Sequence, residues 1–148
     1  MPVRQVLTDK PKPVNELKPF LFDNMLYKIF VYGNLKTGLP LSGYLRKQKF
    51  LGEATTRPLY LLYDLGTMPG LVENIRDGIN INGELWEVDA KTMRILDRVE
   101  GEGVLYKRAE VKILTPNIDY KDTVWAYFFM GEVSDSLKCG KQWPNQSV

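Results

Sequence analysis

The sequence predicts an α+β fold, with a small mixed, mostly antiparallel, barrel-like β-sheet and a few short helices. Runs of β-branched and aromatic residues, which are typical of strands, follow one another over residues 27–130. Turn residues separate these runs, and no regular helical spacers of the kind that indicate a doubly wound parallel sheet lie between them. The 148 residues suffice for one core, and the hydrophobic fraction of 44% is ordinary for a globular protein.

The segment over residues 1–26 is predicted to be an arm without regular structure of its own, because it holds four of the nine prolines and charges of both signs. Its apolar residues 20–22 are expected to be able to dock on the domain. The domain itself is expected over residues 27–130, and residues 131–148 are expected to form a C-terminal tail.

The first half of the domain is predicted to contain strands and one short helix. Residues 27–32 form a dense β-branched and aromatic run, stopped by a Gly-Asn pair, and are expected to be a central strand. A short helix is predicted over residues 40–47, with a proline suited to its first turn. Residues 50–65 predict a bent strand pair or an edge strand, interrupted at Pro58.

The middle of the chain is predicted to hold two turns and a strand. A turn is expected at residues 68–70 and a hairpin turn at the Asp-Gly pair of residues 77–78. Residues 79–88 alternate as a strand, which should make Ile79, Ile81, Leu85 and Trp86 available to the core.

The strongest helix signal covers residues 90–100. Asp89 is a good N-cap, and the apolar residues that flank it are placed to form a hydrophobic staple. Two further strands are expected over residues 105–114 and 123–130, joined by a polar loop.

The residue inventory excludes several kinds of chemistry. The chain has no histidine and one cysteine, Cys139, so neither an internal disulfide nor a His-dependent catalytic triad can form. No metal site built on imidazole or a Cys/His cluster is possible, and we expect no metal and no cofactor. Carboxylate acid/base catalysis, binding without chemistry and a structural role are the remaining options, in a reducing cytoplasm.

Charge and hydropathy argue against nucleic-acid and membrane partners. The formal net charge is +2 and the basic residues are scattered, whereas nucleic-acid binders carry a basic stripe. No long apolar stretch occurs, and the first residues do not lead into the apolar core of a signal peptide.

Glu100 ends the apolar face of the helix predicted over residues 90–100. Desolvation and the partial negative charge of a helix C-terminus should both raise its pKa, which is the condition a general acid/base needs near neutral pH. The alternative is a half-exposed Glu100 paired with Arg98 or Arg108, and taken alone the local pattern favours this ordinary ion pair.

The loop over residues 32–38 follows the first strand directly, so its backbone N–H groups could bind an anion. It is not a phosphate-binding Walker A loop, because no Gly-Lys-Ser/Thr follows at the required spacing. Taken alone, this loop is more typical of a plain turn.

Three motifs in one order resemble the γ-glutamylcyclotransferase-like family, in particular its branch of γ-glutamylamine cyclotransferases and AIG2-like proteins. They are FVYGNLKTG at residues 30–38, GELWEVD at residues 83–89, and LDRVE at residues 96–100 followed by LYKR at residues 105–108. The resemblance covers about residues 27–130. It implies a compact barrel-like α+β fold with a pocket at one end.

The resemblance also implies the site residues. Tyr32, Gly33, Asn34 and Leu35 match the family's Tyr-Gly-Ser/Thr-Leu loop, which holds the amino and carboxylate end of a γ-glutamyl group. The family's catalytic Glu falls on Glu100, and its Tyr before Lys/Gln-Arg falls on Tyr106. Asn34 departs from the pattern, because the family usually has a hydroxyl residue there.

The function implied is that of an acyltransferase that cyclises a γ-glutamyl amine or peptide to 5-oxoproline and releases an amine, without metal or cofactor. The alternative is a non-catalytic binding module for a γ-glutamyl or amino-acid-like ligand on the same fold. A third possibility is an interaction protein whose arm, residues 1–26, docks on a partner. The sequence leaves open the released amine and the oligomeric state.

Overall fold

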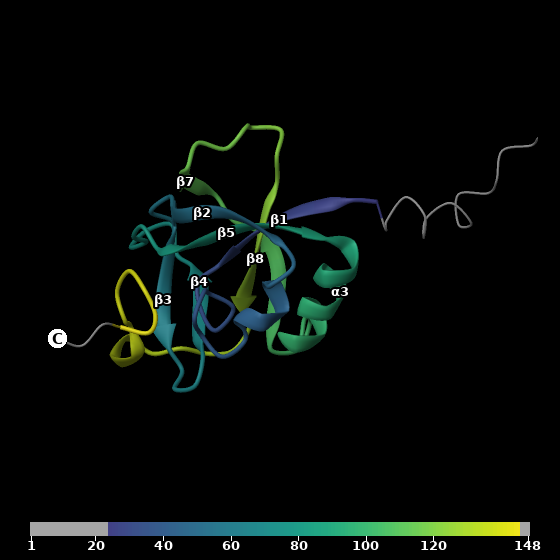
Figure 1. The fold of residues 1–148 in the computed structure, drawn as a ribbon. Coiled ribbons are helices and arrows are strands. Elements are labelled where there is room, and N and C mark those ends of the chain that lie inside the picture. Colours follow the sequence, from purple (N-terminus) through teal and green to yellow (C-terminus); the bar gives the residue numbers. More distant parts are fainter. Residues whose placement is uncertain (1–23, 146–148) are drawn as a thin grey trace, which may run out of the picture.

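A six-stranded curled sheet forms the body of the protein in a computed structural model that describes residues 24–145 (Figure 1). The strand order is β6-β8-β1-β5-β2-β7, and all neighbours are antiparallel except β1 and β8. This confirms the predicted mixed, mostly antiparallel α+β fold. Its strands are β1 (Leu26–Val31), β2 (Lys49–Thr56), β5 (Asn82–Asp89), β6 (Tyr106–Glu110), β7 (Ile113–Thr115) and β8 (Val124–Phe129).

The curl of the sheet follows from the connection between β6 and β7. Only Val111 and Lys112 separate these two strands in the chain, yet they lie at opposite ends of the strand order. The sheet must therefore curl until its two edges approach each other, as in a half-barrel. The single strand predicted over residues 105–114 was wrong, because β6 pairs with β8 whereas β7 pairs with β2.

A separate hairpin of β3 (Tyr60–Asp64) and β4 (Pro69–Glu73) packs on the curled sheet, with β4 beside β8. Residues 50–65, predicted as a bent strand pair or an edge strand, contain two strands, β2 and β3, with Pro58 between them, but these strands belong to different sheets and do not pair with each other. The turn predicted at residues 68–70 was wrong. Pro69 and Gly70 belong to β4, and the turn lies before them, where Leu65 N–H donates to Met68 O at 2.9 Å.

The Asp-Gly pair of residues 77–78 does not form the predicted hairpin turn, because β4 pairs with β3 and β5 pairs with β1 and β2. Strand β5 also begins at Asn82, three residues later than predicted. A Cβ on Gly78 would lie 2.5 Å from the backbone of Leu59. The glycine is therefore explained by a close chain crossing.

The short helix predicted over residues 40–47 is a single 3₁₀ turn, η1 (Ser42–Leu45). Its bonds run from Tyr44 N–H to Leu41 O and from Arg46 N–H to Gly43 O, which is 3₁₀ spacing. Gly43, inside this turn, has a low helix propensity, which disfavours extension into an α-helix.

Strand β1 contributes to two apolar clusters because alternate side chains point to opposite faces. Phe30 lies in the cluster shared with the β3–β4 hairpin, and Ile29 lies in the cluster beneath the helix. Ile81 and Leu85 are in the core, as predicted, whereas Ile79 and Trp86 are only partly buried and pack against the two clusters. The tail also packs, since Trp143 Nε1 donates to Asp64 Oδ1 at 3.0 Å.

The helix α3 (Ala90–Val99) confirms the strongest sequence prediction. The Asp89 side chain caps it by accepting a hydrogen bond from Thr92 N–H at 2.7 Å. Glu100 is its C-cap, and Gly101 follows with a positive φ of 62°. None of the helices between residues 24 and 145 has the length and apolar character needed to cross a membrane.

Loss of the Asp89 cap should lower the free energy of unfolding by about 1 kcal/mol in Asp89→Ala, whereas Asp89→Asn should retain most of the stability. The hydrogen bond from Thr92 N–H holds the pKa of Asp89 below its usual value. The stabilisation should thus be present above the unfolded pKa of about 3.9 and be lost as pH falls through the lower folded pKa. Urea unfolding of the wild type and the two variants at pH 7 and at pH 2 measures both effects. Equal urea midpoints for the wild type and Asp89→Ala at pH 7 would show that the Asp89 cap does not stabilise the protein.

The N-terminal arm was predicted over residues 1–26. Its positions 1–23 lie outside the residues that the structure describes.

Candidate active site

A pocket of about 120 Å³ lies between the loop after β1 and the C-terminal end of α3. All six residues singled out in the sequence line it: Tyr32, Gly33, Asn34, Leu35, Glu100 and Tyr106. The structure therefore brings together positions up to 74 residues apart, a separation given by Tyr32 and Tyr106. The rest of its wall is mostly apolar. Part of it comes from other positions of the same motifs, Phe30, Val31, Val99 and Leu105, and part from residues outside them: Leu41, Met68, Pro69 and Tyr127.

Glu100 is the only carboxylate in this lining. Desolvation by burial raises its pKa to about 7. Within residues 24–145, no hydrogen bond or ion pair reaches its carboxylate. The ordinary ion pair considered from the sequence is thus not formed, because Arg108 binds Asp97 and the exposed Arg98 makes no such contact in this part of the chain.

The loop opposite Glu100 is held by its carbonyls and one side chain. Lys36 N–H donates to Gly33 O at 3.0 Å, and Leu41 N–H donates to Asn34 O at 2.9 Å. The Asn34 amide donates from Nδ2 to Thr67 O at 2.9 Å, which ties this loop to the turn before β4. Leu35 is buried in the cluster beneath the helix.

Three consecutive backbone donors of this loop have no acceptor within the described part of the chain, residues 24–145. Among the hydrogen bonds of residues 24–145, none has the N–H of Gly33, Asn34 or Leu35 as its donor. All three residues line the pocket. Since polar backbone groups in a protein interior are nearly always paired, this cluster of N–H groups is suited to an anionic ligand.

Gly33 is needed for a close contact between this loop and β4. A Cβ at Gly33 would lie 2.7 Å from Pro69 Cγ and 2.9 Å from Pro69 Cδ. The proline ring is rigid, so a larger side chain must displace the pocket wall.

The hydroxyl groups of Tyr32 and Tyr106 are built into the wall. Tyr32 donates to Tyr127 O at 2.5 Å and accepts from Leu71 N–H at 3.2 Å, while Tyr106 donates to Pro69 O at 2.5 Å. Both tyrosines are buried. Burial, and then the negative charge of Glu100, raises the pKa of Tyr106. It therefore stays protonated at neutral pH.

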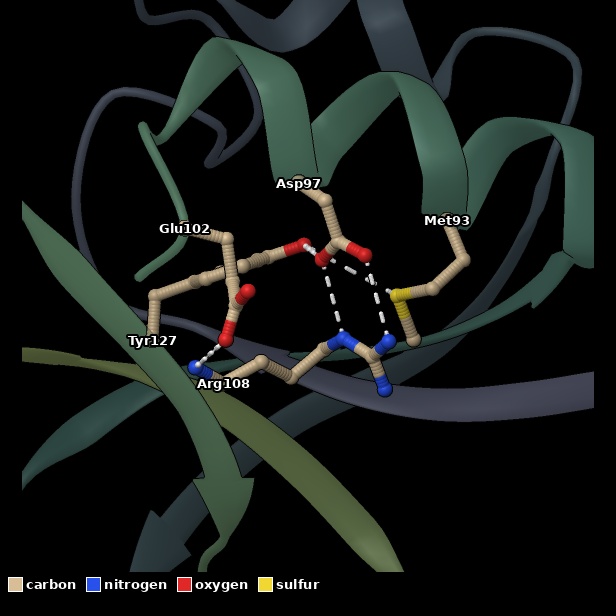
Figure 2. Close-up of polar contacts among 5 residues, drawn as sticks. All are labelled: Met93, Asp97, Glu102, Arg108 and Tyr127. Atoms are coloured by element: carbon tan, nitrogen blue, oxygen red, sulfur yellow. Dashed lines mark hydrogen bonds and ion pairs between the residues drawn. The ribbon is translucent and has the colours of Figure 1, made fainter. Parts of the chain in front are cut away.

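A polar network runs along the side of α3 next to the pocket (Figure 2). Arg108 binds Asp97 through two hydrogen bonds, Nε to Oδ1 at 2.9 Å and Nη2 to Oδ2 at 3.1 Å. The Tyr127 hydroxyl also donates to Asp97 Oδ1 at 2.7 Å. No sequence pattern indicated this network, because its members come from a helix and two strands that only the fold brings together.

No group of three or more His, Cys, Asp and Glu side chains that could hold a metal ion occurs between residues 24 and 145.

Comparisons with known proteins point to one family. The family model described as gamma-glutamyl cyclotransferase, AIG2-like, matches residues 29–145. A Vibrio cholerae protein named "Putative gamma-glutamylcyclotransferase" is 38% identical over 105 residues, covering 71% of this chain and 84% of that protein. The gamma-glutamylaminecyclotransferase of Bos taurus is 35% identical over 95 residues, covering 60% of this chain and 56% of that protein.

A solved structure agrees with the sequence relatives. The crystal structure of an AIG2-like protein from Mus musculus superposes with a TM-score of 0.65 at 25% identity, and the match covers 74% of this chain and 81% of that chain.

Proposed function

The chain belongs to the gamma-glutamyl cyclotransferase, AIG2-like family, and we propose that it cyclises a γ-glutamyl amine or peptide to 5-oxoproline, with release of an amine. The observation that carries the proposal is the carboxylate of Glu100, which shares a pocket with three backbone N–H groups, all four of them without a hydrogen-bond partner among residues 24–145. Such a pocket offers one proton acceptor and one anion site, which a zwitterionic γ-glutamyl group needs.

The chemistry is an intramolecular displacement. The α-amine of the substrate attacks its own γ-carbonyl carbon, a new C–N bond closes the five-membered ring, and the bond to the leaving nitrogen breaks. Because nucleophile and electrophile belong to one molecule, holding the substrate curled supplies much of the acceleration. Glu100 takes one proton from the α-ammonium before the attack and returns it to the leaving nitrogen. The ring nitrogen loses its second proton after the attack, and this proton goes to the released amine, which leaves as an ammonium ion, so no proton is gained or lost overall.

The loop after β1 holds the substrate in this proposal. The N–H groups of Gly33, Asn34 and Leu35 donate to its α-carboxylate, since they have no protein acceptor within residues 24–145. Tyr106 donates its own proton to Pro69 O, which leaves a lone pair of its phenolic oxygen to accept from the α-ammonium. The Asn34 side chain supports the loop by donating a hydrogen bond to Thr67 O. In this proposal it has a structural role at the position where the family usually has a hydroxyl residue.

A panel of γ-glutamyl compounds with a 5-oxoproline assay tests the proposed function. The pocket lining contains no Lys or Arg that could bind a second carboxylate. We therefore expect γ-glutamyl amines to have higher kcat/KM than γ-glutamyl amino acids of similar size. Absence of 5-oxoproline from every compound, with ligand binding retained, would favour the binding-module alternative.

The pH dependence of turnover should report Glu100. The carboxylate must be ionised to accept the proton, and burial raises its pKa to about 7. The rate is therefore expected to fall as pH decreases through about 7, well above the ordinary Glu value of about 4.3. A pH–rate profile measures this directly, and an acidic limb at the ordinary value would contradict Glu100 as the base.

A further inference from the structure

Arg108 lies beside the candidate active site, but its guanidinium is engaged away from Glu100. Two hydrogen bonds fix it to the carboxylate of Asp97. Its guanidinium carbon lies 5.3 Å from the centroid of the Trp125 ring, a cation–π contact, and its backbone N–H donates to Glu102 Oε2 at 3.2 Å. Arg108 is thus held by three elements: α3, β8 and the loop after α3.

Asp97, which binds this guanidinium, precedes Glu100 by one helical turn, and Tyr127, whose hydroxyl donates to Asp97, lines the pocket together with Glu100. Asp97 and Glu100 are three residues apart on α3, a spacing that puts side chains on neighbouring turns about 5–6 Å apart. Tyr106 and Arg108 share one face of β6, and Tyr106 lines the pocket together with Glu100. A guanidinium free to turn towards the pocket would find there a carboxylate without a partner.

We propose that Asp97 is a positioning residue that withholds the Arg108 guanidinium from Glu100, and so leaves the carboxylate in the pocket unpaired and able to exchange a proton. This inference rests on the proposed role of Glu100 as the acid/base. An ion pair with Arg108 would stabilise the ionised carboxylate and make it a weaker base.

The other groups around Glu100 leave Asp97 and Arg108 as the charges that matter. The tyrosine hydroxyls of Tyr32 in the loop after β1, Tyr106 in β6 and Tyr127 in β8 stay neutral, because burial raises the pKa of each. The remaining charged side chains on α3, on β6 and in the adjoining loops are exposed or associated with other groups: Arg94, Arg98, Glu102, Lys107 and Lys36, whose charge interacts with Glu84. The charges of Asp97 and Arg108 cancel in the native protein.

Three variants separate this role from simple stabilisation. Asp97→Asn keeps an acceptor for the Tyr127 hydroxyl but removes the carboxylate charge that binds the guanidinium, which leaves Glu102 as its remaining carboxylate neighbour, so the acidic limb of the pH–rate profile should move down. Arg108→Gln leaves Asp97 uncompensated, and the limb should move up. The double variant removes both charges and should return the limb close to its wild-type position.

Turnover at neutral pH gives a second readout. Asp97→Asn should lower kcat more than it changes KM, and the double variant should recover part of that loss. Arg108→Lys keeps the cation but not the two-pronged contact, so its limb should not move up. Asp97→Asn and Arg108→Gln could both lose activity while the acidic limb of the pH–rate profile stays in place or moves in the same direction in both. In that case the Asp97–Arg108 ion pair is only structural and the inference is wrong.

Direct titration of Glu100 distinguishes failure of this inference from failure of the proposed function. Carbon-13 NMR of protein labelled at the glutamate carboxyls gives its pKa without turnover, and Glu100→Gln identifies the resonance. Shifts of opposite sign in Asp97→Asn and Arg108→Gln support the inference, and equal pKa values overturn it. Unchanged 5-oxoproline production by Glu100→Gln would instead overturn the role of Glu100.

Discussion

Glu100→Gln should lower turnover by about a hundredfold or more while changing substrate affinity little, because general acid/base groups typically contribute ~10² to 10⁴ in rate. Glutamine keeps the shape and hydrogen-bonding capacity of the side chain, but it cannot accept a proton near neutral pH. Steady-state kinetics and ligand titration on the two proteins measure kcat and affinity separately.

The same substitution should raise the free energy of unfolding at neutral pH. Burial raises the folded pKa of Glu100 to about 7, so between its unfolded pKa of about 4.3 and 7 the native protein binds more protons than the unfolded chain. Wild-type stability contributed by this group is therefore present at low pH and falls as pH rises through that window. Glutamine has no charge to desolvate, so the urea midpoint of the variant should exceed that of the wild type at pH 8.

Glu102→Gln is the matched control, because Glu102 is an exposed carboxylate two residues away in the same loop. It should change both turnover and stability only slightly. Wild-type 5-oxoproline production by folded Glu100→Gln, together with a large loss in Glu102→Gln, would move the catalytic assignment to Glu102.

Gly33→Val should abolish measurable ligand binding and turnover. Its added atoms would occupy the space of the Pro69 ring, since even the Cβ would lie 2.7 Å from Pro69 Cγ. Because β4 cannot yield without losing its pairing with β3, the loop must move and carry its three N–H donors out of place. Isothermal titration with a γ-glutamyl compound, at a temperature where the variant is folded by circular dichroism, checks this.

Gly43→Val provides the matched control for glycine replacement. A Cβ at Gly43 meets no atom within 4 Å, and its φ lies outside the left-handed region. The control should bind ligand like the wild type. Equal affinity of folded Gly33→Val and the wild type would remove the loop after β1 from the binding site.

Local patterns determined those parts of the fold that depend on neighbours in the sequence. The β-branched run of β1, the alternation that buries Ile81 and Leu85, and the Asp89 cap of α3 each act within a few residues, so the sequence alone predicts them. The same holds for Glu100, whose place at the end of an apolar helix face already implied a raised pKa.

Errors in the sequence predictions fall where long-range pairing overrides a local signal. Pro69 and Gly70 are typical turn residues, but pairing with β3 makes them part of a strand. The Asp-Gly pair of residues 77–78 is typical of a hairpin, but its glycine allows a close chain crossing beside Leu59. Residues 105–114 alternate like one strand, but curling of the sheet sends their two halves to opposite edges.

The sequence by itself determined the fold class and the chemical inventory, because composition and periodicity are written along the chain. The six residues to examine came from the resemblance of three ordered motifs to a known family. Only the tertiary structure decided that these six residues share one pocket and that Arg108 binds Asp97 instead of Glu100. It also showed that residue 33 must be a glycine because the Pro69 ring lies against it. The physical reason is distance along the chain. Each of these contacts joins elements whose approach depends on how the whole sheet curls, and no local propensity contains that information.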